Sequence, residues 1–210
     1  MATSGAKTIT DVTVPEPALP VERLREKGWV RIESDQRVLA RLPVVTVHGH
    51  TVAYGDDRLR DRVIDAIGCD RSWRFFFATR LALSPSPPGS IPSMVVRIVR
   101  SRVRDGFADR LRERGFTDVS QSRREELRVR SGERASLTGY RARDLLTCAD
   151  EPTDLPVEGW VGVWNHDGTF YVAGGAFPAV DLGDVLDVDL ETDPGTFRTE
   201  LFELIRTVGE

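Results

Sequence analysis

The segment Trp73–Leu83 constrains the fold of this chain more than any other. Its sequence, WRFFFATRLAL, has large apolar side chains on both of the faces that a β-strand presents. One face carries Trp73, Phe75, Phe77, Leu81 and Leu83, and the other carries Phe76, Ala78 and Ala82. A strand that is apolar on both faces lies inside a sheet that is covered on both sides. The segment therefore predicts a central strand with packed elements above and below it.

The rest of the chain reads as further strands and a few helices. Strands are expected at Trp29–Glu33, Val38–Leu42 and Val44–Tyr54, and hairpins at Arg123–Arg130 with Arg134–Thr147 and at Val157–Trp164 with Thr169–Ala176. Helices are expected at Val21–Lys27, from an Asp56-Asp57 cap to Gly68, at Ile91–Arg114 with a break at Asp105-Gly106, and from an Asp193 cap through Val208. This pattern predicts an α+β fold, a largely antiparallel sheet with helices packed on it as an α/β/α-like sandwich.

The first hairpin carries a more detailed prediction. With Arg130 opposite Arg134, the residue facing Leu127 is Leu137. Strict alternation would then turn later arginines inward, so Gly139 is expected to form a β-bulge. The acidic stretch Asp181–Asp193 is expected to be irregular.

The domain organisation follows from length and composition. A chain of 210 residues suffices for one well-filled core. Residues 1–18, rich in Thr, Ser, Ala and Pro, are expected to form a flexible arm, and residues 19–210 a single domain. The proline-rich segment Ser84–Ser93 is taken as a crossover loop, because the elements before it cannot close a core alone.

Charge is distinctive in kind and in distribution. All but two of the 29 basic residues are arginines, which suits a GC-rich genome or a salt-rich cytoplasm and favours a halophilic source. Residues 96–143 hold 14 arginines against 7 acidic residues, whereas residues 144–210 hold 2 against 15. The basic stretch can bind a polyanion, or the two stretches can fold together and neutralise each other. Acidic patches nearby weaken binding to nucleic acid, so a nucleic-acid partner is not expected.

Cysteine content and hydropathy bear on location. Cys69 and Cys148 give neither a disulfide framework nor a metal knuckle, so a reducing compartment is expected. The N-terminus lacks the apolar core of a signal peptide, and no apolar stretch is long enough to span a bilayer. A cytoplasmic protein is therefore expected.

His48-Gly49-His50 is the candidate metal site. Residues two apart on a strand point to the same face, so both imidazoles can reach one ion. A third ligand is needed, and His166, the remaining histidine, is at a predicted turn. A bulge at Gly49 would separate the two rings, and ordinary surface histidines give the same pattern.

Motifs for catalysis are absent from the sequence. No nucleophile elbow surrounds a serine, no base is placed by motif beside either cysteine, and Gly174-Gly175 lacks the spacing of a nucleotide-binding loop. The chain is accordingly expected to be non-enzymatic and to have no cofactor.

Two further groups are candidates for binding. Arg97, Arg100 and Arg104 fall within one arc of the predicted helix and can contact an anionic partner, although a solvated helix face has the same pattern. Trp160 and Trp164 share a strand face with a glycine between them. That pair can line the base of a ligand pocket, or it can pack in the core against a helix that approaches the strand closely.

Three stretches resemble a haloarchaeal family of uncharacterised function: HTVAYGDDRLRDRV at His50–Val63, WRFFFATRLALSP at Trp73–Pro85 and LRVRSGERASLTGYRA at Leu127–Ala142. The resemblance covers about residues 28–145 and implies no catalytic residue. The second half also resembles the fold of the photosystem II subunit PsbP and a Ran-binding nuclear-import factor. The cues are Gly139-Tyr140, the hairpin Trp160–Ala176 and the closing helix Phe197–Val208. That PsbP-like fold implies a binding or accessory role.

Three hypotheses for function result. The first is a non-enzymatic binding or accessory protein, whose partner is a protein or a small molecule. The second is a small-molecule or metal-dependent enzyme that uses His48 and His50 with nearby carboxylates. The third is a polyanion binder acting through Arg97, Arg100 and Arg104 on the helix of residues 91–114.

Overall fold

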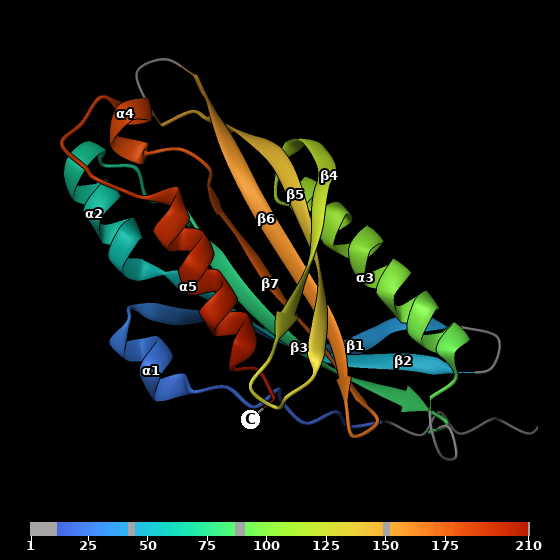
Figure 1. Cartoon of the computed structure of the whole chain (residues 1–210). Helices are drawn as coiled ribbons and strands as arrows, with labels where there is room; N and C mark the ends of the chain where they lie inside the picture. Colours follow the sequence, from blue (N-terminus) through green and yellow to red (C-terminus); the bar gives the residue numbers. More distant parts are fainter. Residues whose placement is uncertain (1–11, 42–44, 87–90, 149–151, 210) are drawn as a thin grey trace, which may run out of the picture.

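A computed structural model describes residues 12–41, 45–86, 91–148 and 152–209, in which one antiparallel sheet of seven strands lies between helices (Figure 1). The strands are β1 (Trp29–Arg41), β2 (Thr46–Asp56), β3 (Phe75–Ser84), β4 (Thr117–Arg128), β5 (Arg134–Leu146), β6 (Thr153–His166) and β7 (Thr169–Pro178). The helices are α1 (Val21–Glu26), α2 (Asp57–Ile67), α3 (Ser93–Glu113), α4 (Leu182–Leu186) and α5 (Pro194–Arg206).

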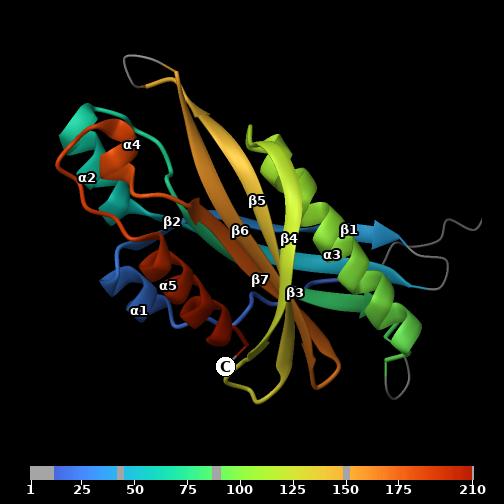
Figure 2. The same ribbon diagram turned by 45° about the horizontal axis from the view of Figure 1, so that its top comes forward.

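The helices divide between the two faces of the sheet. The long helix α3 crosses one face, and α1, α2, α4 and α5 gather on the other (Figures 1 and 2). This arrangement confirms the predicted α+β fold, a largely antiparallel sheet with helices packed on it.

The strand order is β1-β2-β3-β7-β6-β5-β4. It consists of two meanders, β1 to β3 and β4 to β7, which meet edge to edge where β3 pairs with β7. Phe75 pairs there with Ala176, although the two are about a hundred residues apart in the chain.

Strand β3 is an interior strand packed on both faces, as its sequence predicts. Phe76 lies on the α5 side, with its ring centroid 6.4 Å from that of Trp29 and 6.3 Å from that of Tyr54. Phe77 lies on the α3 side and stacks on Phe107 at 5.8 Å. Apolar residues on both faces of one strand thus hold both helical layers.

Strand β1 differs from its prediction. Two separate strands were expected, but Trp29–Arg41 forms one strand with two register shifts against β2, which leave Ile32 and Leu39 as extra residues. Both are β-bulges, in which two residues oppose one on the neighbouring strand. The alternative of a bulge at Gly49 does not hold, because the register of β2 with β3 runs through Gly49 without a shift.

The hairpin of β4 and β5 also corrects the prediction. Leu127 pairs with Ala135 rather than Leu137, a shift of two residues. Gly139 is not a bulge in β5, since its register with β6 is unbroken; the irregularity lies opposite, in β4. At the start of β5 the odd-numbered residues are buried, and at its end the even-numbered ones are buried, although the strand has no bulge. The reason is that helices cover opposite faces of the sheet at the two ends of this strand.

The ends of two helices lie where the sequence predicts them. The Asp56 carboxylate accepts a hydrogen bond from the Leu59 amide at the start of α2, and Gly68 ends that helix with φ of 69°. Asp193 caps α5 in the same way. The expected break at Asp105-Gly106 is wrong, since α3 continues through it, and the acidic stretch contains the short helix α4. No helix among the described residues has both the length and the apolar character needed to cross a membrane.

Part of the segment predicted as an arm lies against the sheet. The Val14 side chain is 1% exposed, and the Gln36 side chain on β1 accepts a hydrogen bond from the Val14 amide and donates one to the Val12 carbonyl. The remainder of the predicted arm, residues 1–11, lies outside the described residues.

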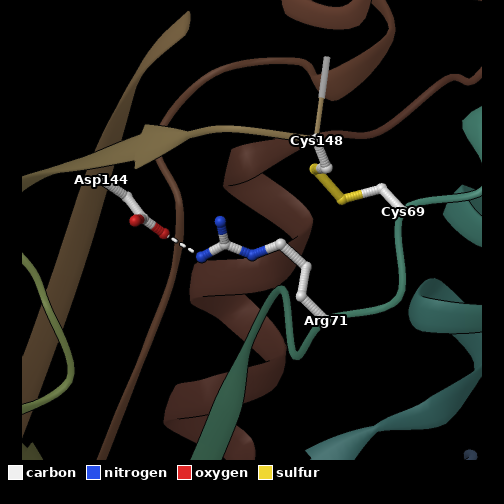
Figure 3. Close-up of a disulfide and its surroundings, with 4 residues drawn as sticks. All are labelled: Cys69, Arg71, Asp144 and Cys148. Carbon is white, nitrogen blue, oxygen red and sulfur yellow. Dashed lines mark hydrogen bonds and ion pairs between the residues drawn. A yellow bond between two sulfur atoms is a disulfide. The ribbon is translucent and has the colours of Figure 1, made fainter. Parts of the chain in front are cut away.

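A disulfide joins Cys69 to Cys148, which corrects the expectation of unpaired cysteines. Cys69 follows α2 and Cys148 follows β5, and their Cα atoms are 5.6 Å apart (Figure 3). An ion pair between Arg71 and Asp144 joins the same two segments. The sequence could not predict this pairing, because the cysteines are 79 residues apart and only the fold brings them together.

A buried ion-pair cluster joins several elements on the α5 side. The Arg74 guanidinium donates to Asp56 and to Glu200, with a distance of 2.5 Å in each pair, and lies over the rings of Trp29 and Phe197. Arg74 and Asp56 are each 6% exposed. This cluster therefore connects the α2 cap, the start of β3 and helix α5 away from water.

A candidate ligand cavity beneath helix α3

A cavity of about 410 Å³ lies between α3 and the part of the sheet formed by β1, β2 and β3. Its volume is within the range of small-molecule sites, about 300–1,000 Å³. Most of its lining is apolar and comes from the sheet and from one side of the helix: Val38, Leu39, Ala40, Val47, Ala53, Phe75, Phe77, Leu81, Ile98, Val99, Val103, Phe107, Val161 and Val172.

The cavity exists because α3 packs closely on only one side. Near β5 and β6 the helix touches the sheet, where Phe107 approaches the glycine position Gly159 and the Tyr140 ring is 5.2 Å from that of Phe107. On β2 the lining residues are small, namely Val47, Thr51 and Ala53. Gly106 in the helix adds no side chain, and a Cβ built there would meet nothing within 4 Å.

The wall on the β1 side depends on the second bulge. Leu39, the extra residue, lies over Gly49, where a Cβ would come within 2.3 Å of the Leu39 Cδ1 atom. Only a glycine at position 49 admits this side chain so close to the strand. Leu39 and Val38 remain 42% and 39% exposed, so the wall on this side is in contact with solvent.

The interior polar groups satisfy each other. The hydroxyls of Thr51 and Thr79, on neighbouring strands, are 2.8 Å apart and hydrogen-bonded. Charged residues belong to β1, to α3 and to the residue after α3: Glu33, Arg37, Arg102, Arg110 and Arg114. The cavity is thus apolar inside, with a cationic margin.

The arginines predicted for anion binding occupy another side of α3. At 100° per residue, Arg97, Arg100 and Arg104 lie on the side of the helix away from Arg102 and Gly106. Arg97 and Arg100 are exposed, and the Arg104 carbonyl accepts a hydrogen bond of 2.8 Å from the Tyr140 hydroxyl. None of the three lines the cavity.

The predicted metal pair lies on the opposite face of the sheet. Because β2 has no bulge there, His48 and His50 do share a face. The Nδ1 atom of His50 is 2.8 Å from the Val14 carbonyl and must donate to it, so Nε2, 3.2 Å from the Ser34 hydroxyl, is the atom left for a ligand. Among the described residues, no group of three potential ligands gathers around this pair or elsewhere.

Trp160 and Trp164 lie in the core on the α5 face. Trp160 is 0% exposed, meets Phe202 edge to face at 5.1 Å, and has the guanidinium groups of Arg123 and Arg198 each 5.1 Å from its ring centre. Trp164 stacks on Tyr171 of the next strand. The pair packs against side chains of the protein itself and lines neither of the two main cavities found in the described residues.

Sequence reasoning missed the cavity because its lining comes from distant segments. Arg102, Gly106 and Arg110 did carry a signal, since they are spaced four residues apart on one side of a helix. The same glycine, next to Asp105, also predicts a break in the helix, and this prediction is wrong. The bulge that places Leu39 is not visible in the sequence, because extra residues in a strand carry no side-chain signature.

A family model described as a domain of unknown function, DUF6517, matches residues 16–209. The chain belongs to the DUF6517 family. No curated protein and no solved structure matches it. The cavity, the Cys69–Cys148 disulfide and the Arg74 cluster all lie within the DUF6517 match. This agrees with the expectation of an uncharacterised family.

Proposed function

We propose that this protein is a non-enzymatic binding protein whose cavity beneath α3 holds a small, largely apolar molecule. The observation that carries the proposal is the cavity of about 410 Å³, lined by apolar side chains from strands β1, β2, β3, β6 and β7 and from helix α3. The cavity is open to solvent on the β1 side, where Val38 and Leu39 are exposed, so water reaches its apolar wall. An apolar ligand that covers this wall removes it from water, which is favourable by about 25 cal/mol per Å².

The construction of the cavity supports a binding role. Three features keep it open: the helix glycine Gly106, the bulge that places Leu39 over Gly49, and the small lining residues of β2. Larger side chains at Gly106 or on β2 would fill the cavity between α3 and the sheet. Its interior polar pair, Thr51 and Thr79, is already satisfied and supplies neither an acid nor a base for catalysis.

Binding of phenylnaphthylamine, a neutral dye that fluoresces in apolar surroundings, tests the proposal. We expect the dye to bind the wild-type protein and to bind Gly106→Leu about tenfold or more weakly, because Gly106 lines the cavity and a leucine there would occupy part of its space. Gly106→Ala is the matched control, since its single methyl group meets no atom within 4 Å. Equal binding by the wild type and Gly106→Leu, or no binding at all, contradicts the proposal.

The other two hypotheses stay predictions. A metal-dependent activity at His48 and His50 predicts stoichiometric metal in protein purified without chelators, and its loss in the His48→Ala, His50→Ala double variant. Polyanion binding through Arg97, Arg100 and Arg104 predicts an affinity that falls steeply with salt. A protein partner in place of a small molecule predicts stoichiometric co-purification from the native host.

The source and the fold relationship also remain predictions. The predominance of arginine over lysine supports a haloarchaeal source. An antiparallel sheet between two helical layers supports a PsbP-like fold, an argument from architecture alone.

The expected cytoplasmic location is weakened by the disulfide. Disulfides persist mainly in oxidising compartments and are rare in the cytoplasm. We infer that Cys69 and Cys148 are oxidised in the native host. Alkylation of intact cells, followed by mass spectrometry, measures their state directly. Two alkylated thiols would overturn this inference and restore the cytoplasmic expectation.

A further inference from the structure

The charged residues at the cavity are mostly cationic. Four arginines and one glutamate line it, which gives a net charge of +3. Arg110 lies 3.7 Å from Glu33, and Arg37 lies 3.4 Å from Asp35. Arg102 and Arg114 have no carboxylate within ion-pair distance among the described residues. The margin of the cavity thus has more positive charge than the neighbouring carboxylates balance.

Two of these arginines flank the glycine position of α3. Arg102, Gly106 and Arg110 follow one another at intervals of four residues, so they lie on one side of the helix, one turn apart. The gap left by Gly106 is open and solvent-exposed. Long side chains one turn above and one turn below can both reach a group in that gap, and guanidinium groups bind carboxylates and phosphates with paired hydrogen bonds.

Arg114 adds a cation with an aromatic neighbour. Its guanidinium lies 4.2 Å from the centre of the Phe75 ring, which also lines the cavity. Loss of water around this group lowers the pKa of Arg114, an effect that Glu33 opposes and Arg110 reinforces. Arg114 is exposed and has no carboxylate within ion-pair distance among the described residues, so its guanidinium can bind an anion with charge-assisted hydrogen bonds.

The interior has the opposite character. Thr51 and Thr79 bond to each other, and the remaining residues facing the space from β2, β3, β6 and β7 are apolar. A polar or charged group placed there would lose its hydration without gaining a partner. The two regions therefore require different chemistry at the two ends of one ligand.

On these grounds, and resting on the proposed function, we propose that the ligand is an anionic amphiphile. Its hydrocarbon part fills the cavity between α3 and the sheet, and its terminal carboxylate or phosphate lies at Gly106, between Arg102 and Arg110. Arg37 and Arg114 contribute to the same positive field.

Calorimetric titration with decanoate and decanol tests this assignment, because the two probes share a chain and differ in charge. We expect the wild type to bind decanoate about tenfold more tightly than decanol, the effect of one charge-assisted hydrogen bond. The Arg102→Gln, Arg110→Gln double variant should lose this preference and bind decanol unchanged. Both residues are at the surface, so circular dichroism should show an intact fold.

The matched control is the Arg97→Gln, Arg100→Gln double variant, which removes the same charge from the outward side of the same helix. It should retain the preference for decanoate. If both double variants lost the preference for decanoate equally, the preference would reflect the overall charge of the helix, and the assignment to Arg102 and Arg110 would be overturned. Equal binding of decanoate and decanol by the wild type would overturn it while leaving the cavity as a binding site. Binding of neither probe would overturn both this inference and the proposed function.

Discussion

At the scale of single residues, glycines decide where side chains come close. Gly49 admits Leu39, and Gly139 admits Ser122, whose hydroxyl oxygen would lie 2.8 Å from a Cβ at that position. A glycine within a strand can indicate a β-bulge in that strand, which is the expectation at Gly139 and one alternative at Gly49. In the structure the bulge belongs to the neighbouring strand in each case, because the bare backbone accommodates a residue that the neighbour presents. A glycine in a strand predicts close approach without saying which strand is irregular.

His166 offers a residue-scale prediction. Its Nδ1 atom is 3.0 Å from a carboxylate oxygen of Glu133, so the turn between β6 and β7 is bound to the turn between β4 and β5. The hydrogen bond to Glu133 raises the pKa of His166 above 6.5. A raised folded-state pKa contributes stability that is full below the unfolded value and is lost as pH rises through the folded value. Histidine NMR titration should give a pKa above 6.5, and Glu133→Gln should lower it.

Glu126→Gln is the control for that titration. Glu126 is an exposed carboxylate on β4 that pairs with Arg134 instead of His166. The His166 pKa should therefore stay unchanged in this variant. An equal fall in the Glu126→Gln and Glu133→Gln proteins would contradict the assigned hydrogen bond.

At the scale of elements, helix ends were predictable and strand continuity was not. Asp56, Gly68 and Asp193 mark helix ends through local hydrogen bonds or a positive φ, which depend on a few neighbouring residues. The extent of β1 and the register of β4 with β5 depend on partners elsewhere in the chain. The cavity likewise depends on distant segments, because it requires both the bulge at Leu39 and a space between α3 and the sheet.

The Arg74 cluster gives a prediction about how elements are held together. Arg74→Met leaves the carboxylates of Asp56 and Glu200 without their buried partner, so we expect a loss of about 3–5 kcal/mol in the free energy of unfolding. Urea denaturation measures it. Arg60→Met is the control, because its pair with Asp70 is exposed and its removal should destabilise the protein far less. Equal losses would show that the buried cluster contributes no more than a surface pair.

The same cluster sets a pH dependence. Burial alone would raise the pKa of Glu200, but Arg74 and Lys27 outweigh it and hold that pKa below 4.5. A lowered folded-state pKa contributes stability that is present above the unfolded value and is lost as pH falls through the folded value. The difference in stability between the wild type and Arg74→Met should therefore shrink on acidification below about pH 4. A constant difference would contradict the role of Glu200.

At the scale of the whole molecule, the disulfide should contribute substantially. It closes a loop of 79 residues, and a bridge of this kind typically stabilises by about 2–4 kcal/mol, chiefly by restricting the unfolded chain. We expect the Cys69→Ser, Cys148→Ser variant to lose about that much in urea denaturation. Reduction of the wild type should give the same loss and should leave the variant unchanged. An effect of reductant on the variant would place the sensitivity elsewhere than in this bridge.

The edge-to-edge meeting of the two meanders has a consequence for how the chain reaches this structure. Each meander can form from neighbouring hairpins, but the pairing of β3 with β7 must bring together segments about a hundred residues apart. Until that pairing is complete, β3 and β7 are edge strands of two separate sheets. Their apolar side chains and unpaired backbone groups are then exposed to solvent. Pairing of β3 with β7 within one molecule therefore competes with pairing of either strand with the same strand of another molecule.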